Sequence, residues 1–163
     1  MFKHFTRQQN ITFIDKLHKR VASAAALLTS PDGELLILKA NYKHHWSLPG
    51  GLIDEDESIL EAVRREIHEE IGLDLAVDRF GFWAVVDRHS DIARSYYFVF
   101  NGEISSEEIS QIRLQGREID ESRFVSKQQV LTNDLEYGKI ITAWANNQAG
   151  YLEHRFIGAS TDE

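Results

Sequence analysis

Three glutamates, Glu66, Glu69 and Glu70, have a type and a spacing that suggest a specific chemistry. On a helix of about 3.6 residues per turn, positions i, i+3 and i+4 project from one side, so three like charges crowd together. They also lie in the last turn before Gly72, where the helix dipole disfavours anions by roughly 0.3 to 1 kcal/mol each. Side chains placed against local electrostatics in this way are expected to hold a hard cation, and their oxygens suit Mg²⁺ or, alternatively, Mn²⁺.

The neighbouring residues could support such a site. Glu57 lies just before the predicted helix, and Arg65 within the helix could pair with Glu57 and hold the loop against it. Two adjacent glycines, Gly50 and Gly51, permit backbone angles or close approaches that side chains would block. The alternative is a solvated acidic face, which is the commoner role of an isolated acidic trio on a helix.

Charge and composition disfavour several classes of function. Nine acidic residues and two arginines between Asp54 and Asp74 account for seven of the eight net negative charges. The charge therefore disfavours general nucleic-acid binding, and a divalent cation is the partner that this segment suggests. The absence of cysteine excludes cysteine nucleophiles and thiolate zinc sites and fits a reducing compartment. Because we see neither a signal-like start nor an apolar segment of membrane length, we expect a cytoplasmic protein without membrane association.

Hydrophobic patterning predicts the elements that must position these groups. The clearest helix runs from Ser58 to Ile71, because Ser58 and Glu61 form a capping box and Gly72 supplies the C-terminal cap. The other predicted elements are a hairpin of buried strands over 21–39, a loop at 41–51, strands at 80–86, 96–100 and 123–125, a polar loop at 88–94, and a helix within 133–147. Residues 1–20 fit either a helix or an edge strand.

This order of elements indicates an α/β fold with a mixed β-sheet covered on both faces. At 163 residues the chain is long enough for one domain and short for two. We therefore interpret residues 1–163 as a single domain, with residues 1–20 and 150–163 at its periphery.

One stretch of the chain resembles the signature of a known family. Gly51, five residues, Glu57, seven residues and then Arg65-Glu66-Ile67-His68-Glu69-Glu70-Ile71-Gly72-Leu73 are similar to the complete motif of the Nudix hydrolases, at all nine specified positions. The resemblance implies an α/β/α sandwich with a mixed sheet, in which a loop, helix and loop bind a divalent metal. It also implies hydrolysis, by water attacking phosphorus, of a nucleoside diphosphate linked to another moiety.

The resemblance also implies roles for individual residues. The positions that it assigns are metal ligands at Glu66, Glu69 and Glu70, an orienting pair at Arg65 and Glu57, and a loop glycine at Gly51. A diphosphate is anionic and repels hydroxide, so a metal is needed to neutralise it and to align the water. The general base is either Glu69 or Glu70, or a residue outside the signature, for which Glu118, Asp120 and Glu121 are alternatives.

Substrate contacts are predicted from groups near the loop that can stack on a base or bind phosphate. The selected residues are Lys39, Trp46, Gly50, Gly51 and Arg88, and further candidates are Tyr42, Trp83 and Tyr96 for stacking and Lys43 and Arg94 for phosphate. Trp83 and Tyr96 lie in apolar runs and have a core position as their alternative. We assign no metal to the adjacent histidines His44 and His45.

The predicted partner is a small-molecule nucleoside diphosphate derivative, and the family suggests a homodimer. The first alternative function is a nucleotide-binding or regulatory Nudix module without turnover, which is disfavoured because all the signature carboxylates are present. A related diphosphate isomerase is disfavoured by the absence of cysteine, and RNA cap removal by the absence of a basic face.

Overall fold

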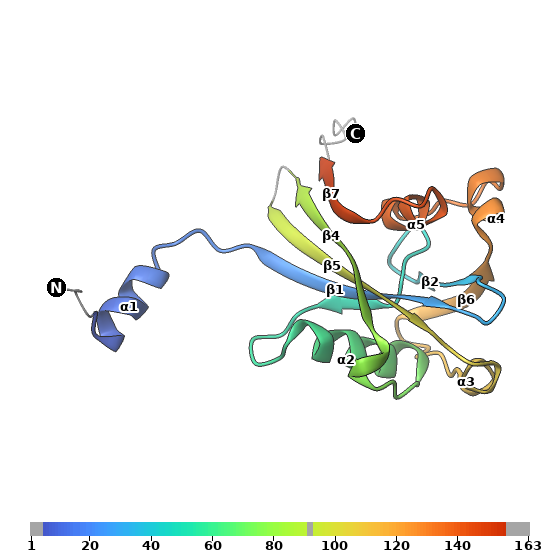
Figure 1. Cartoon of the computed structure of the whole chain (residues 1–163), viewed down its shortest axis with the longest axis horizontal. Helices are drawn as coiled ribbons and strands as arrows, with labels where there is room; N and C mark the ends of the chain where they lie inside the picture. The colour runs from blue at the N-terminus through green and yellow to red at the C-terminus, as the bar shows by residue number, and fades with distance from the viewer. Residues whose placement is uncertain (1–4, 91–92, 156–163) are drawn as a thin grey trace.

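The computed structural model describes residues 5–90 and 93–155. Its elements, in chain order, are α1 (Arg7–Ile14), β1 (Val21–Thr29), β2 (Leu35–Ala40), β3 (Gly50–Leu52), α2 (Ile59–Ile71), the 3₁₀ turn η1 (Val77–Arg79), β4 (Gly81–His89), β5 (Arg94–Glu103), α3 (Ser106–Gln111), β6 (Ile119–Val125), α4 (Lys127–Thr132), α5 (Lys139–Ala145) and β7 (Gly150–Arg155). Figure 1 shows how they are arranged.

The described strands form one mixed sheet in the order β6-β2-β1-β5-β4-β7, and β3 pairs with β1 outside that path. The β1–β5 and β4–β7 pairs are parallel, and the other pairs are antiparallel. β2 and β3 share one edge of β1, because β3 pairs with Ser23 to Ala25 and β2 pairs with β1 only at Thr29. Residues 41–49 connect these two neighbours of β1.

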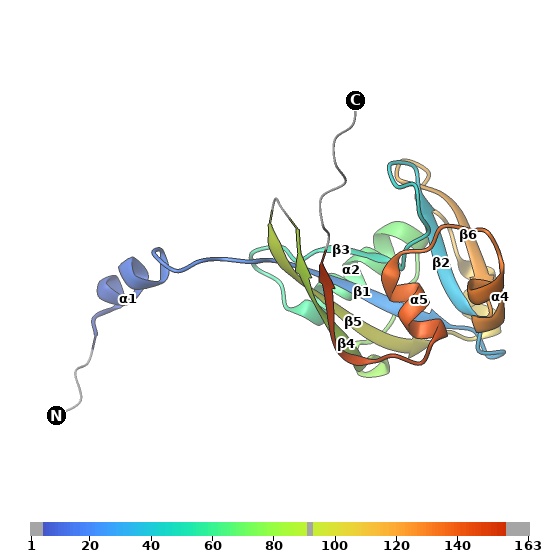
Figure 2. The same cartoon turned by 90° about the horizontal axis from the view of Figure 1, so that it is seen from above.

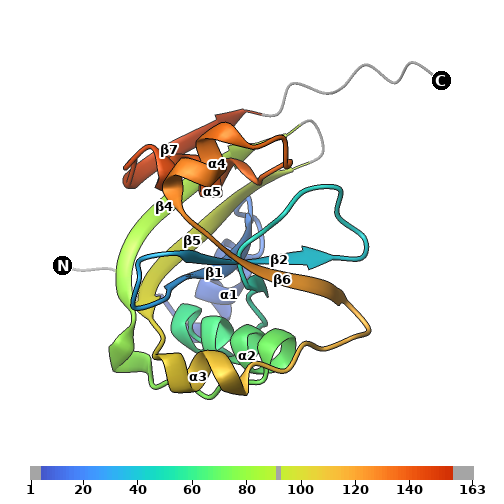
Figure 3. The ribbon, with the colours of Figure 1, turned by 90° about the vertical axis from the view of Figure 1, so that its right-hand side faces the viewer.

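Side chains along the central strands point alternately to the two faces of the sheet, so each face has its own apolar core. In β1, Ala24, Ala26 and Leu28 face the core that contains α2, whereas Ala25 and Leu27 face the core that contains α5. Figure 3 shows the sheet between α2 and α3 on one side and α4 and α5 on the other. The predicted α/β/α sandwich with a mixed sheet is therefore confirmed.

The signature helix has the ends that the sequence predicts. The Ser58 side chain accepts from the Glu61 backbone, the Glu61 carboxylate accepts from the Ser58 backbone, and Gly72 has φ 74°. The core face of α2 comprises Ala62, Val63, Ile67 and Ile71. A helix that is capped at both ends and packed along one face is a rigid support for the glutamates on its other side.

Three predicted elements differ from the structure. Arg88 lies in β4 rather than in a polar loop, because β4 and β5 extend their antiparallel pairing to His89 and Arg94. The predicted loop at 41–51 ends earlier, because Gly50 and Gly51 belong to β3. The last helix is shorter than the predicted range 133–147, because α5 begins only after Gly138 and ends at Ala145.

Of the two alternatives for residues 1–20, the structure has the helix. Residues 7–14 form α1, which lies away from the sheet in both views and has no buried residue (Figures 1 and 2).

The sequence predicts no element at α3, α4 or β7, and β6 begins four residues before the predicted strand. Among the described residues, no helix is long and apolar enough to span a membrane.

Candidate active site

A double hydrogen bond between Arg65 and Glu57 joins α2 to the preceding loop. Arg65 Nε donates to Glu57 Oε2 at 3.0 Å, and Arg65 Nη2 donates to Glu57 Oε1 at 2.7 Å. The same Nη2 also donates to the Leu52 carbonyl at 2.9 Å, and Glu57 Oε1 accepts from the Asp54 backbone at 2.8 Å. Hydrogen bonding to Arg65 lowers the pKa of Glu57 below its usual value. The predicted pairing is thus present, with the planar geometry that favours a bidentate pair.

The third arm of the Arg65 guanidinium reaches two of the signature glutamates. Arg65 Nη1 donates to Glu66 Oε1 at 2.8 Å and to Glu69 Oε2 at 3.2 Å. The Glu66 side chain is 15% exposed and that of Glu69 is 53% exposed. The three signature glutamates are therefore not equivalent, because Glu69 projects much further into solvent.

Glu70 is the most enclosed of the signature carboxylates, at 7% exposure. Its Oε2 accepts from the Gly50 backbone N–H at 2.8 Å. Burial raises the pKa of Glu70 to about 7, because the hydrogen bond from Gly50 only partly offsets desolvation and the charge of Glu66 adds to it. Burial also raises the pKa of Glu66. Two carboxyl groups are thus held close together at a site where ionising both is unfavourable.

The two adjacent glycines at the start of β3, Gly50 and Gly51, have separate structural roles. Gly50 has φ 147°, and a Cβ there would lie 2.2 Å from the Ala24 carbonyl oxygen. Gly51 has an ordinary backbone conformation, but a Cβ there would lie 2.2 Å from Glu66 Oε1. Gly50 is therefore required by the sheet, whereas Gly51 leaves room for a carboxylate oxygen.

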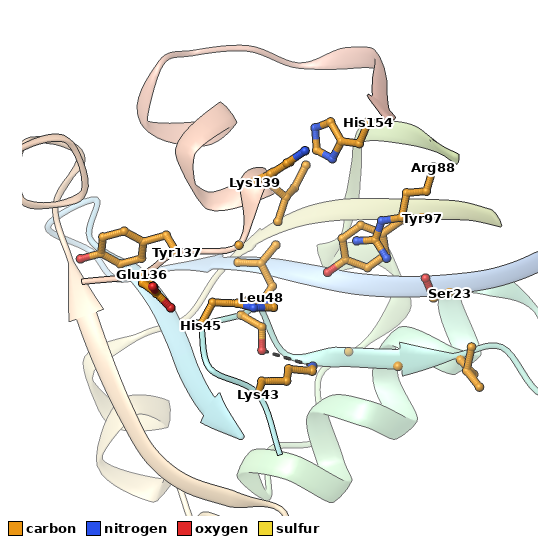
Figure 4. A pocket seen from close by; sticks show the side chains of 16 residues that line it. Ser23, Lys43, His45, Leu48, Arg88, Tyr97, Glu136, Tyr137, Lys139 and His154 are labelled. Carbon is orange, nitrogen blue, oxygen red and sulfur yellow. Dashed lines mark hydrogen bonds between the residues drawn. The ribbon is translucent and has the colours of Figure 1, made fainter. Parts of the chain in front are cut away.

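A cleft of about 730 Å³ opens on the other side of Gly50 and Gly51 (Figure 4). Its lining residues are Ser23, Lys43, His45, Ser47, Leu48, Gly50, Gly51, Leu52, Arg88, Tyr97, Glu136, Tyr137, Gly138, Lys139, Ile140 and His154. The signature carboxylates do not line it, and the two glycines form the boundary between cleft and glutamates. Lys43 connects both places, since it lines the cleft and its charge lowers the pKa of Glu70.

The predicted substrate contacts are partly brought together in this cleft. Gly50, Gly51 and Arg88 line it, as does Lys43. Lys39 does not, because its ammonium group donates to the His44 carbonyl. Trp46 is 5% exposed and belongs to the core, so its predicted stacking role is wrong.

The remaining aromatic and basic candidates lie outside the cleft. Trp83 packs against the core beside α5, and Tyr96 is half-buried beneath the Arg20 guanidinium. Arg94 is exposed. Tyr42 is exposed, yet its pKa is raised by burial and by the charges of Glu70, Glu118 and Glu66, so it lies beside the carboxylates rather than in the cleft.

The residues that line the cleft but are not singled out from the sequence include Tyr137, Lys139 and His154. Tyr137 lies just before α5, Lys139 is the first residue of α5, and His154 belongs to β7. The alternating burial of β7 is the typical pattern of a half-buried strand, but residues 150–155 follow a helix at the end of the described chain and were interpreted as peripheral.

The family to which the chain belongs follows from a direct comparison. The model of the NUDIX domain matches residues 19–144, which include the whole signature, α2 and the loop before it. The chain belongs to the Nudix family.

Relatives of known structure support the same assignment. The MutT protein from Methanosarcina mazei Go1 is 26% identical, with a TM-score of 0.64, and the match covers 81% of this chain and 97% of that one. The NUDIX domain of Shewanella oneidensis NrtR, solved with ADP ribose, has a TM-score of 0.68 at 17% identity and covers 88% and 97%. At 17% identity, the similarity to the NrtR domain shows only that the two chains share a fold.

Among curated proteins, an RNA pyrophosphohydrolase from Helicobacter pylori (strain G27) is 34% identical over 95 residues, which is 53% of this chain and 61% of that protein. For two other curated relatives, the match spans only 36% and 30% of their length. The family is thus established, whereas the substrates of these relatives bear on this Nudix protein only as a basis for proposals.

The Nudix family is typically dependent on divalent metal, and the carboxylates of this chain fit that requirement. Glu66, which is partly buried, and Glu70, which is buried, offer hard oxygen donors, and desolvation raises the pKa of both even though Arg65 pairs with Glu66. Within residues 5–90 and 93–155, no three histidine, aspartate or glutamate side chains gather closely enough to surround one ion. Mg²⁺ commonly keeps several waters and needs only one or two carboxylates, so the pair is a sufficient donor set.

The three alternative bases that lie outside the Nudix signature have different surroundings in the structure. The charge of Glu118 raises the pKa values of both Glu66 and Glu70, so Glu118 is near enough to interact with these carboxylates. Glu121 instead accepts from Arg123 Nε at 2.6 Å, and Asp120 is exposed on β6.

Proposed function

We propose that this Nudix protein is a divalent-metal-dependent hydrolase of the diphosphate bond in a nucleoside diphosphate joined to another moiety. The observation that carries the proposal is a pair of enclosed carboxylates, the partly buried Glu66 and the buried Glu70, held by Arg65 and the Gly50 N–H at the boundary of a cationic cleft. A purely structural acidic face would be solvated, whereas enclosing two carboxylates with only one arginine beside them is costly.

Each residue has a role in that chemistry. Glu66 and Glu70 would hold the metal, with Glu69 as a more exposed third donor, and the metal would supply charge neutralisation and orient the attacking water. Arg65 and Glu57 keep the helix and loop in register, which holds the Glu66 carboxylate in place. Lys43 adds positive charge on the cleft side, where an anionic diphosphate would enter.

The proton released by the attacking water needs an acceptor. Glu70 is the first candidate, because burial raises its pKa to about 7 in the absence of metal and its carboxylate lies at the site. Glu118 is the second candidate, because it lies outside the signature and near enough to interact with the same carboxylates. Replacing Glu118 with glutamine separates the two, since a rate lowered without a change in metal affinity identifies Glu118 as the acceptor.

The direct test is hydrolysis by the full chain of nucleoside triphosphates, nucleotide sugars and dinucleoside polyphosphates, with Mg²⁺, Mn²⁺ or EDTA. We expect cleavage of at least one class at a phosphoanhydride bond, and loss of cleavage in EDTA. Cleavage that persists in EDTA would contradict the metal dependence. Binding of a nucleotide with no cleavage under any condition would favour the alternative of a binding or regulatory module.

Metal affinity is expected to weaken as the pH falls below about 7. A carboxyl binds a cation only when ionised, and the pKa of Glu70 is raised to about 7, so below that pH a proton must be displaced. The apparent Kd for Mn²⁺ should rise by up to about tenfold per pH unit below 7 and level off above it. Calorimetric titration of the full chain between roughly pH 5.5 and 8.5 measures this. A Kd that is constant down to the lower limit would be inconsistent with Glu70 as a ligand.

Three expectations from the sequence are retained as proposals. We propose that residues 1–163 act as one domain, with α1 as a peripheral segment, that the protein is cytoplasmic, and that it forms a homodimer. Light scattering of the full chain tests the last of these.

A further inference from the structure

The cleft is a cationic surface on an acidic protein. Of the residues that line it, Lys43, Arg88 and Lys139 carry positive charge, and Glu136 alone among these described residues is acidic. The chain as a whole has a net charge of −8. A positively charged cleft on a negatively charged protein indicates an anionic ligand. Such a cleft attracts anions locally, although the protein as a whole repels them.

Arg88 is held in the cleft by its own contacts. Its guanidinium lies over the Tyr97 ring, with the central carbon 3.8 Å from the ring centroid, and Tyr97 is buried beneath it. Arg88 Nε is buried without a hydrogen-bond partner, and no carboxylate in the described ranges forms an ion pair with this guanidinium. Burial lowers the pKa of Arg88. Interaction with the Tyr97 side chain offsets only part of that effect. A stacked arginine without a carboxylate partner is a charge that an anionic ligand would stabilise.

Sheet pairing places His154 beside this arginine. Arg88 and His154 are direct partners across the parallel β4–β7 pair, so their side chains share one face of the sheet. Two residues earlier on each strand, Val86 and Leu152 pack in the core on that same face. Figure 4 shows Lys139 next to His154, on the same wall of the cleft as Arg88. The pKa of His154 is lowered by burial and by the charges of Lys139 and Arg88, which fits this proximity.

We propose that Arg88, Lys139 and His154 form a subsite for a further phosphoryl group of the substrate, beyond the diphosphate that is hydrolysed. The inference rests on the proposed function. A planar guanidinium, an ammonium and an imidazole on one wall provide charge and several N–H donors, which match the oxygens of a phosphoryl group. A neutral sugar would leave the charge of Arg88 uncompensated.

The subsite defines the class of substrate. A nucleoside triphosphate or a longer polyphosphate carries a third phosphoryl group, and a nucleoside diphosphate joined to a neutral sugar does not. One residue of the subsite, His154 on β7, lies beyond the residues matched by the NUDIX domain model, whereas Arg88 and Lys139 lie within them. None of the three belongs to the signature from Gly51 to Leu73, so the proposed selectivity would not follow from the signature itself.

The first test compares Arg88→Gln with Arg94→Gln. Arg94 is the matched control, because it is an exposed arginine on the adjacent strand that does not line the cleft. We expect Arg88→Gln to raise the KM for a nucleoside triphosphate by about 10- to 100-fold, with a smaller change in kcat. The KM for the nucleotide sugar of the same base should change less than about threefold, and Arg94→Gln should match the wild type. Equal losses for both substrates in Arg88→Gln would overturn the subsite.

One further substrate shows which phosphoryl group occupies the subsite, a third phosphate of the polyphosphate chain or a phosphate on the ribose. A nucleoside diphosphate that carries its extra phosphate on the ribose is compared with the triphosphate. Dependence on Arg88 for the triphosphate alone places the subsite along the polyphosphate chain. Dependence for the ribose phosphate alone places it near the sugar.

The second test does not depend on turnover. Calorimetry of the full chain in EDTA, with inorganic triphosphate as the probe, should detect binding that weakens at least tenfold in Arg88→Gln and also in His154→Asn. Thermal unfolding of each variant shows that it is folded. If the wild type hydrolyses nothing but binds the probe through Arg88, the proposed function fails and the subsite stands. If it hydrolyses nucleotide sugars and the probe binds equally to wild type and variants, the subsite fails and the function stands.

Discussion

Glu70→Gln is expected to lower kcat for any substrate that the enzyme cleaves by about 10³-fold. The glutamine keeps the size of the side chain and can still accept from the Gly50 N–H through its amide oxygen, so the loop should keep its position. What is lost is the negative charge that would hold the metal and the carboxyl that titrates near pH 7. Steady-state kinetics with Mg²⁺ and calorimetry with Mn²⁺ measure the two effects separately.

The matched control for this variant lies on the same helix. Glu61→Gln makes the same chemical change at the N-terminal end of α2, where glutamine also completes a capping box. Its activity should stay within about twofold of the wild type. If Glu70→Gln retains more than about a tenth of the wild-type kcat while Glu61→Gln is normal, Glu70 is not a central ligand or base.

Gly51→Ala is expected to lower kcat/KM by about 10²-fold with little loss of stability. The new methyl would occupy the position 2.2 Å from Glu66 Oε1, and the end of that side chain can move aside at low cost. The fold is therefore retained, but the displaced carboxylate no longer meets the cation in the same geometry. Thermal unfolding and kinetics of the same preparation give both quantities.

Substitutions at two other glycines serve as controls for Gly51→Ala. Gly50→Ala should instead destabilise the fold by about 3 kcal/mol or more, because its Cβ would meet the Ala24 carbonyl and its φ of 147° disfavours any side chain. Gly116→Ala, with nothing within 4 Å of the added Cβ, should leave activity and stability unchanged. A fully active Gly51→Ala would show that the position of Glu66 does not matter for the reaction.

The part of the site that could be predicted from sequence is the part determined by local interactions. The ends of α2 depend on residues three or four positions apart, and the Glu57–Arg65 pair spans one loop and two turns of the same helix. Such interactions leave a pattern in the chain itself. For this reason the helix, its caps and the orienting pair were predicted.

The cleft could not be predicted because it depends on contacts between distant segments. Arg88 was placed in a loop because polar residues interrupt the apolar run, whereas pairing with both β5 and β7 makes it part of a strand. The stacking role predicted for Trp46 failed for the same reason, since its burial results from packing against segments far along the chain. His154 gives no signal of its own until β7 is known to lie beside β4.

The pairing of β7 with β4 also restricts how this protein could change through evolution. The strand covers the outer edge of β4, and its own outer edge is short, with alternate exposed positions that include Glu153 and Arg155. Charged side chains on a short edge strand oppose pairing with other molecules and hence aggregation. A truncation that removed β7 to widen substrate range would uncover a nine-residue strand at the same time. If His154 forms part of the proposed subsite, β7 serves both substrate selectivity and protection of the sheet edge, and single substitutions within β7 are then expected to change selectivity with less aggregation than its loss.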